Sequence, residues 1–100
     1  MNVTINQKEN DYHVILEGRI DTTNADQFQH EIEPLMTAKD ANITLDCAAM
    51  EYTSSQGLRT FLMLQKSVIA HNGKLELINM QPQVKEIFDI TGFSNIITIK

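Results

Sequence analysis

Two adjacent serines, Ser54 and Ser55, are the residues of this sequence whose type and place are most suited to chemistry. They lie in residues 52–59, Y-T-S-S-Q-G-L-R, between a predicted strand and a predicted helix. Hydroxyls at a helix start face unpaired backbone N–H groups and the positive end of the helix dipole. One serine can serve as the N-cap, which leaves the other exposed for modification. A phosphate there would add about −1.5 to −2 charges at neutral pH and change what the surface binds.

The residues beside the serines allow both a plain cap and a regulated site. Capping alone is the ordinary role of Ser54 or Ser55, since serine is among the preferred N-caps. Gly57 has no side chain, so another part of the chain can come close to it. Arg59 lies one turn into the helix, where it can reach an acidic group.

Three acidic residues, Asp21, Asp46 and Glu51, would oppose a phosphate if the fold gathers them at this helix start. The ordinary role of Asp21 and Asp46 is a cap or a hydrogen bond within a turn, which aspartate forms readily. Both alternatives stay open for each aspartate.

Other chemistries lack their sequence patterns. His13, His30, His71 and Cys47 have no spacing typical of a metal site, and Cys47 is expected to be a small buried thiol. The chain contains no G-x-S-x-G for a hydrolase and neither G-x-G-x-x-G nor a Walker loop for nucleotides. The sequence therefore predicts no catalytic residue, no metal and no cofactor.

Composition indicates one globular domain over residues 1–100. The chain is 42% hydrophobic and 21% charged, with a formal net charge of −5 and scattered Lys and Arg residues. Direct nucleic-acid binding is not expected, because it needs clustered cations. A single cysteine fits a reducing cytoplasm, and we expect no signal peptide and no membrane insertion, since no apolar run approaches the ~20 residues of a span.

The N-terminal half predicts a hairpin and a helix. Asn2–Ile5 and 12–16 read as two antiparallel strands around a turn at 8–11, and the second strand ends near Gly18. Thr23 or Asn24 can cap the helix that follows. Its buried face is expected to hold Ala25, Phe28, Ile32, Leu35 and Met36. Pro34 lies inside this pattern and predicts a kink or break near Glu33.

The middle of the chain predicts a βαβ unit across residues 42–79. A strand at 42–47 and a loop at 48–53 precede a helix from Ser54 or Ser55 to His71. Gly73 is expected to end this helix in the left-handed conformation. The predicted core face of the helix holds Leu58, Phe61, Leu62, Gln65, Val68 and Ile69. The apolar cluster at 61–64 is expected to be core and helix–helix contact, and Met63 or Phe61 becomes an interface candidate if it faces outward.

The C-terminal part predicts a strand at 74–79, a helix opened by Pro82 and closed by Gly92, and a short strand within 95–100. Val84, Ile87 and Phe88 form the inner face of that helix. Because βαβ units give parallel strands, the fold class is α/β with a mixed sheet, the N-terminal hairpin being antiparallel.

The order of five segments resembles the STAS domain. The segments are G-R-I-D-T-T-N-A, I-T-L-D-C, Y-T-S-S-Q-G-L-R, N-G-K-L-E-L-I-N and V-K-E-I-F-D-I-T-G-F, and the resemblance spans about Val14 to Ile97. It implies a single-domain fold with about four helices over the mixed sheet. Stand-alone members are anti-sigma factor antagonists. They bind an anti-sigma factor that is a serine kinase, lose binding when it phosphorylates them, and are reset by a phosphatase.

The same resemblance carries the phosphorylation site to particular residues. Aligning the family string D-S-S-G-L on Gly57 places the acceptor at Ser55, with Ser54 as second choice because serine replaces the family's aspartate there. The expected partner surface around it comprises Asp21, Thr22, Asn24, Asp46, Thr53, Ser54, Gln56, Gly57 and Arg59.

Two alternatives to the switch remain. One is an unswitched STAS scaffold bound to a transporter ATPase, which the loss of the family's aspartate at position 54 favours. The other is nucleotide contact near Asp21 and Ser55. The expected oligomeric state is a monomer or a weak dimer.

Overall fold

A computed structural model describes all residues, 1–100, as five strands, three α-helices and one 3-10 helix. The elements are β1 (Asn2–Lys8), β2 (Asp11–Ile20), α1 (Ala25–Met36), β3 (Asn42–Thr53), α2 (Ser55–Ala70), β4 (Lys74–Ile78), α3 (Pro82–Ile90), η1 (Phe93–Asn95) and β5 (Thr98–Ile99). The strand order is β1-β2-β3-β4-β5, with β1 and β2 antiparallel and the other pairs parallel. The predicted α/β fold with a mixed sheet is confirmed, with three α-helices and η1 in place of about four helices.

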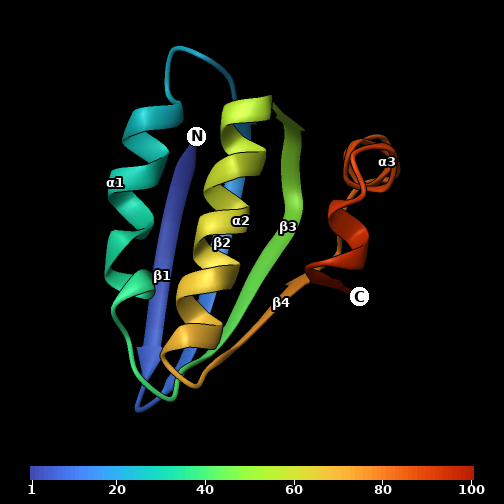
Figure 1. The fold of residues 1–100 in the computed structure, drawn as a ribbon. Helices are drawn as coiled ribbons and strands as arrows, with labels where there is room; N and C mark the ends of the chain where they lie inside the picture. The colour runs from blue at the N-terminus through green and yellow to red at the C-terminus, as the bar shows by residue number, and fades with distance from the viewer.

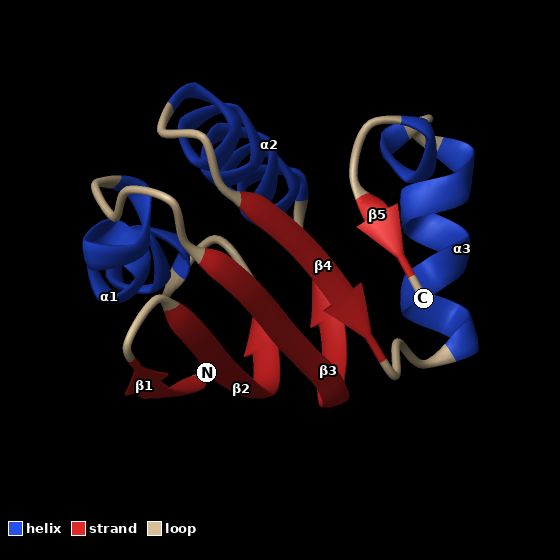
Figure 2. Cartoon of the chain, turned by 90° about the horizontal axis from the view of Figure 1, so that it is seen from below, coloured by secondary structure: helices blue, strands red, loops and turns tan.

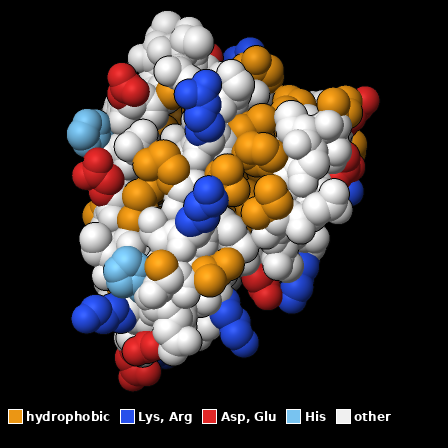
Figure 3. Space-filling view, viewed as in Figure 1, with side chains coloured by type: hydrophobic (Ala, Val, Ile, Leu, Met, Phe, Trp, Pro, Cys, Tyr) orange, Lys and Arg blue, Asp and Glu red, His pale blue; other side chains and the backbone are white.

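The helices lie on one side of the sheet. Figure 1 shows α1 and α2 side by side in front of the strands, and α3 beyond β3 and β4. Figure 2 shows the opposite side of β1, β2 and β3 without a covering helix. On the helical side, apolar side chains reach the surface between α2 and α3 (Figure 3). The exposed large apolar residues include Ile69 of α2 and Ile96, which follows η1.

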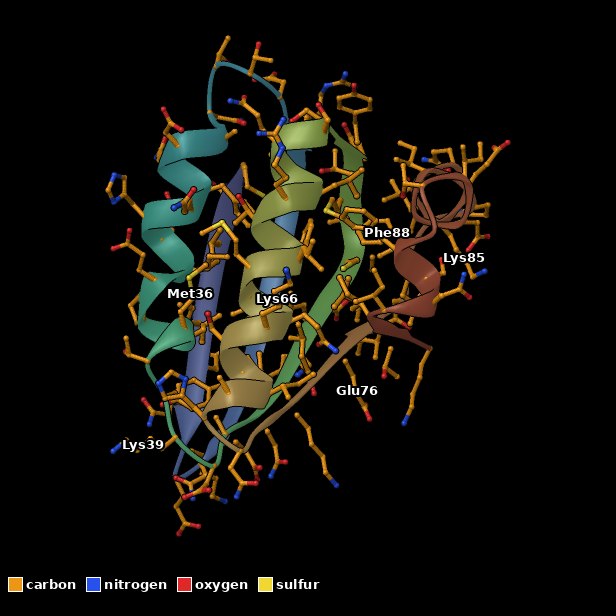
Figure 4. All side chains as sticks on the ribbon, in the orientation of Figure 1. Met36, Lys39, Lys66, Glu76, Lys85 and Phe88 are labelled. Carbon is orange, nitrogen blue, oxygen red and sulfur yellow. The ribbon has the colours of Figure 1, made fainter.

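Three phenylalanine rings tie the helices together in the core. Phe61 of α2 packs against Phe28 of α1 at 5.4 Å between ring centroids and against Phe88 of α3 at 5.6 Å. Phe88 reaches inward from α3 toward β3 (Figure 4). All three rings are fully buried, and tilted pairs at these distances are favourable for aromatic side chains.

The N-terminal hairpin is confirmed and is longer than predicted. Lys8 pairs with Asp11 around a two-residue turn, in which Glu9 takes a positive φ of 55°. The second strand does not end near Gly18, as predicted, but continues to Ile20. Gly18 itself adopts a φ of 104°, a conformation open to glycine, and the strand passes through it.

The predicted loop at 48–53 is wrong, because β3 runs through it to Thr53. The pairing of β3 with β2 shifts register twice, between Ile15 and Glu17 and again between Gly18 and Arg19. These bulges bring Cys47, Met50 and Thr53 to the core at intervals of three residues. The two-residue alternation that reveals a strand in a sequence is therefore missing here.

The predicted break near Glu33 is also wrong. Helix α1 continues through Pro34 to Met36. Pro34 lies in the last turn, where its missing N–H leaves the carbonyl oxygen of His30 without its helical partner, and only Leu35 and Met36 follow it in the helix. The predicted buried residues Ala25, Phe28, Ile32 and Leu35 are confirmed, and Met36 is partly buried.

Helix α2 begins where it was predicted and ends at Ala70, with His71 as its C-cap. Asn72, and not Gly73, takes the left-handed conformation, with a φ of 63°. Gly73 is needed for space, since a Cβ there would lie 2.6 Å from the carbonyl oxygen of Ala41. The predicted end of the helix before Gly73 is confirmed. Its predicted cause is wrong, because Gly73 is not in the left-handed conformation.

Most of the predicted core face of α2 is confirmed. Leu58, Phe61, Gln65 and Val68 are buried and Leu62 is partly buried, but Ile69 is 60% exposed. Leu64, which belongs to the apolar cluster at 61–64 that was predicted to be core, is buried as well. Met63 faces outward with 43% of its surface exposed.

The C-terminal elements follow the prediction closely. Pro82 occupies the first position of α3, Val84 and Phe88 are buried, and Gly92 closes the segment with a φ of 81°. Phe93 packs back on the core from η1, and the last strand shortens to Thr98–Ile99.

Candidate functional site

The start of α2 lies at the edge of the sheet where β2 and β3 both end. Because these strands are parallel, their carboxyl ends meet at one edge, which is at the top of Figure 1. The backbone N–H of Ser54 donates to the carbonyl oxygen of Ile20 at 2.9 Å. This bond places the 21–24 loop beside the first turn of α2, so Asp21, Thr22 and Asn24 join the serines at one edge.

Ser54 is the N-cap of α2 and its hydroxyl is already engaged. Its backbone is extended (φ −82°, ψ 173°), and its Oγ accepts a hydrogen bond from the N–H of Gly57 at 3.3 Å. Only 8% of Ser54 is exposed. The plain capping role left open for one of the two serines is therefore filled by Ser54.

Ser55 is the first residue of α2 and differs from Ser54 in its exposure and in its hydrogen bonding. It is exposed, and its hydroxyl makes no hydrogen bond within the chain. As the first helical residue it lies among the N–H groups that a helix leaves unpaired at its positive end. An anion attached to Ser55 would therefore be both accessible and electrostatically favoured.

Gly57 fits α2 tightly onto the ends of the two strands. A Cβ at this position would overlap the Oγ1 of Thr53 and lie 2.9 Å from the Cγ2 of Ile20. Thr53 is buried and donates through its hydroxyl to the carbonyl oxygen of Ser54 at 3.2 Å. The absence of a side chain at Gly57 thus lets the first turn of α2 lie directly against the side chains of Thr53 and Ile20. This close contact fixes the position of Ser54 and Ser55 relative to the sheet.

We expect Gly57→Ala to lower the free energy of unfolding by about 1–3 kcal/mol, as overpacking of a filled site does. Helix propensity alone predicts the opposite, a gain of about 1 kcal/mol for the same change. Urea unfolding followed by circular dichroism measures the sign. Gln56→Ala, at the exposed neighbouring position, is the matched control and should change stability little. A more stable Gly57→Ala protein would contradict the packing described here.

The 21–24 loop is held by its own side chains. Asp21 Oδ1 accepts hydrogen bonds from the hydroxyl and the backbone N–H of Thr23, and these bonds, the hydroxyl first, lower the pKa of Asp21. Asn24 Oδ1 accepts from the N–H of Asp21 at 2.9 Å, and Asn24 Nδ2 donates to the carbonyl oxygen of Arg19 at 2.8 Å. Asp21 therefore forms the turn that was one of its two open alternatives.

The predicted N-cap of α1 is confirmed in its position but not in its hydrogen bond. Asn24 occupies the N-cap position, but its side chain forms no cap hydrogen bond. It bonds to β2 and to the loop instead, while the carbonyl oxygen of Asp21 accepts from the N–H of Ala25. The polar side chains of the loop thus shape the edge of the sheet more than the helix end.

Two arginines stand at this edge. The guanidinium of Arg19 lies 4.8 Å from the ring centroid of Tyr52, in a cation–π contact that joins β2 to β3. Arg59 borders a hollow of about 160 Å³ between α1 and α2, shared with Asp26, Gln56 and Met63. Sequence reasoning missed Arg19 and Tyr52, because the bulges of β3 hide which residues of β2 and β3 pair. It also missed Asp26 of α1, which meets Arg59 only through the packing of α1 beside α2.

Asp46 lies apart from the start of α2. It pairs with Ile15 of β2, five residues before Ile20 and therefore roughly 16 Å along the strand. Its carboxylate accepts from the N–H of Ala48 at 3.1 Å and from the side chain of Asn79 at 3.3 Å. The unpredicted length of β3 therefore separates Asp46 from the start of α2, and its place on the partner surface stays a prediction.

The remaining titratable groups show no second site. No group of three or more His, Cys, Asp or Glu side chains is arranged to hold a metal ion. Cys47 is fully buried, and its burial, followed by the charge of Asp46, raises its pKa to about 12. None of the helices has the length and apolar character needed to cross a membrane.

Comparison with known proteins finds relatives of this chain in sequence and in fold. A sequence model of the STAS domain matches residues 2–100. The anti-sigma-B factor antagonist of Bacillus subtilis (strain 168) is 33% identical over 99 residues, covering 99% of this chain and 90% of its own length.

Two solved structures share the fold. The anti-sigma factor antagonist SpoIIAA in its unphosphorylated form superposes with a TM-score of 0.81 at 18% identity, over 99% of this chain and 88% of its own. The Bacillus cell fate determinant SpoIIAA in its phosphorylated form gives 0.73 at 17% identity, over 99% and 91%.

Proposed function

Because this chain belongs to the STAS domain family, we propose that it is an anti-sigma factor antagonist that works by binding and not by catalysis. The proposed binding surface is the edge formed by Asp21–Asn24 and Thr53–Arg59, which we term the switch surface. The relative from Bacillus subtilis is an anti-sigma-B factor antagonist and matches nearly the full chain. The observation that carries the proposal is the contrast between an engaged Ser54 and a free, exposed Ser55.

The proposed regulation is phosphorylation of Ser55 by an anti-sigma factor that is a serine kinase. At the first position of α2 the phosphate is favoured by the helix dipole, by about 0.3–1 kcal/mol at an exposed site, so the fold tolerates it. The added charge falls beside Asp21, on a protein whose net charge is already −5. A partner that fits the neutral hydroxyl then meets a strongly negative surface, and binding is lost while the fold stays intact.

Ser54 remains the second choice for the acceptor. Phosphorylation there would require a nearly buried hydroxyl to leave the N–H of Gly57, and it would remove the cap of α2. A kinase that modified Ser54 would therefore have to open the first turn of the helix.

The two serines should separate clearly in stability. Ser54→Ala removes the cap and should lower the free energy of unfolding by about 1 kcal/mol, within the range of 0.5–2 for such caps. Ser55→Ala removes a hydroxyl with no partner and should change stability by less than about 0.5 kcal/mol. Urea titration of both variants measures the difference. Equal stabilities would mean that Ser54 is not the working cap, and the assignment of the acceptor to Ser55 would lose its main support.

The proposed phosphorylation of Ser55 is one step of a reversible cycle. The partner is an anti-sigma factor kinase, a phosphatase removes the phosphate, and the protein acts in the cytoplasm. The test is reconstitution with the cognate anti-sigma factor: the unmodified protein should bind it, and incubation with ATP should add one phosphate to Ser55 and release the complex. Failure of the unmodified protein to bind would overturn the proposed function.

A second candidate is an unswitched scaffold on a transporter ATPase. Position 54 favours it, because serine replaces the family's aspartate and is used there as a cap. Co-purification with an ATPase, without phosphate on either serine, would select this alternative. Nucleotide contact near Asp21 and Ser55 ranks below both, and the absence of nucleotide binding in a titration would exclude it.

A further inference from the structure

The free edge of β1 is seven residues long and is not covered by another element. β1 (Asn2–Lys8) pairs only with β2, and no element lies beyond it at the end of the sheet (Figure 2). At the other end, β5 has two residues and lies beside α3. The part of β3 that extends past β4 is flanked by α3, where Gln81 Nε2 donates to the carbonyl oxygen of Ala48 at 2.8 Å.

This edge lacks the features that usually keep such strands apart. β1 has no proline and no bulge, and its pairing with β2 is unbroken over seven residues. Its one charged side chain, Lys8, lies at the end of the strand. An unprotected edge of this kind presents a row of N–H and C=O groups ready to pair with another strand.

We propose that β1 pairs with β1 of a second copy of this chain. The two strands run antiparallel about a two-fold axis at Ile5, the middle residue of β1, and join two five-stranded sheets into one of ten strands. In this register Ile5 faces its own copy, Thr4 faces Asn6, and Asn2 faces Lys8. The inference does not rest on the proposed switch.

The apolar side of the strand supports this register. Ile5 pairs with the fully buried Val14 and points to the helical side of the sheet, yet it is 37% exposed. A hollow of about 530 Å³ runs along the edge between β1 and α1, lined in part by Val3, Ile5 and Glu31. Two copies of Ile5 placed opposite each other would cover their exposed surfaces, and Gln7 of the second copy would stand opposite Val3, beside Glu31.

The charges on the uncovered side of the sheet support it as well. Lys8 stands opposite Asp11 within one chain, and Asn2 stands opposite Glu17. When Lys8 faces Asn2 of the second copy, four side chains line up across the joined strands. In order they are Asp11 and Lys8 of one copy, then Asn2 and Glu17 of the other. The lysine lies between two carboxylates and no like charges are opposed, which is the favourable arrangement for cross-strand neighbours.

The size of the contact determines its strength. One pairing of seven residues is smaller than the interfaces of about 1,200–2,000 Å² that give stable complexes. The dimer should therefore be weak and should form as the protein concentration rises.

Sedimentation equilibrium over micromolar to millimolar protein tests the dimer. The apparent mass of the wild type should rise from 11.4 kDa toward twice that value. Ile5→Lys places two like charges face to face and should hold the mass at 11.4 kDa, with an unchanged circular dichroism spectrum. Ile69→Lys, which adds the same charge at an exposed position on α2, should associate like the wild type. A wild type that stays monomeric, or an Ile5→Lys protein that associates equally, would overturn the proposal.

Oxidative cross-linking tests the register. Ile5→Cys places the new thiol opposite its own copy, at a Cα separation of about 4.5–5.5 Å that a disulfide can span. Gln7→Cys puts its two thiols four residues apart along the strands, roughly 13 Å, and should cross-link far more slowly. The native Cys47 is buried and does not compete. Equal cross-linking of the two variants would rule out an axis at Ile5.

Discussion

Ser55→Asp will weaken binding to the anti-sigma factor about tenfold to a hundredfold, because each factor of ten corresponds to about 1.4 kcal/mol and like-charge contacts cost several. The aspartate adds a fixed negative charge where the proposed phosphate would stand, next to the loop that carries Asp21. Ser55→Asn has the same size without the charge and should bind like the wild type. Isothermal titration calorimetry of both variants against the same partner measures the difference.

The salt dependence of the same measurement separates charge from shape. Since the added charge is exposed, raising the ionic strength should shrink the gap between Ser55→Asp and Ser55→Asn. If both variants lose binding equally, the contact depends on the hydroxyl itself. If neither does, Ser55 lies outside the interface and the switch surface is misplaced.

Phe61→Ala will lower the free energy of unfolding by about 3–5 kcal/mol, the usual range for removing a large buried aromatic side chain. Phe61 is fully buried and is the ring that contacts both Phe28 of α1 and Phe88 of α3. Chemical denaturation measures the loss.

Met63→Ala is the matched control for this change. Met63 lies on the same helix with 43% of its surface exposed, so its removal should alter stability by less than about 0.5 kcal/mol. A small effect of Phe61→Ala would contradict the role of this ring as the link between the three helices. A large effect of Met63→Ala would show that the outer face of α2 is covered in solution.

The residues that hold the fold together are separate from the residue proposed to switch binding. The core that holds the helices is built from side chains such as Phe61 that have no contact with solvent. The proposed switch is a single exposed hydroxyl on the first turn of α2. A phosphate can therefore change the surface charge without disturbing the packing, since the N-cap bond to Gly57 is made by Ser54.

The fold could be predicted where periodicity and capping agree. The helix over 55–70 and the turn at Gly92 carry the residues that their geometry requires, and the hairpin and the helix over 25–36 follow from their apolar spacing. The second half of β3 could not be predicted, because its two bulges replace the alternating pattern of a strand with a spacing of three. Pro34 led to the wrong prediction of a break near Glu33. A proline inside a helical pattern usually marks a break, but here the helix continues for two residues beyond it.

The candidate site could be predicted in part. The sequence points to a serine pair at a helix start, but the choice between Ser54 and Ser55 depends on burial and on the bond to Gly57, which are properties of the folded chain. The distance of Asp46 from α2 could not be predicted, because β3 is six residues longer than predicted and lies between them. Arg19 and Tyr52 were missed because their pairing follows from the shifted register.

The most direct test is to find where phosphate is attached in the cell. The protein should be purified from its native host under several growth conditions, and its intact mass measured with fragmentation across residues 51–59. The account predicts a fraction carrying one phosphate, located on Ser55. Phosphate on Ser54 alone would contradict the assignment drawn from its burial and its cap, and no phosphate under any condition would contradict the switch itself.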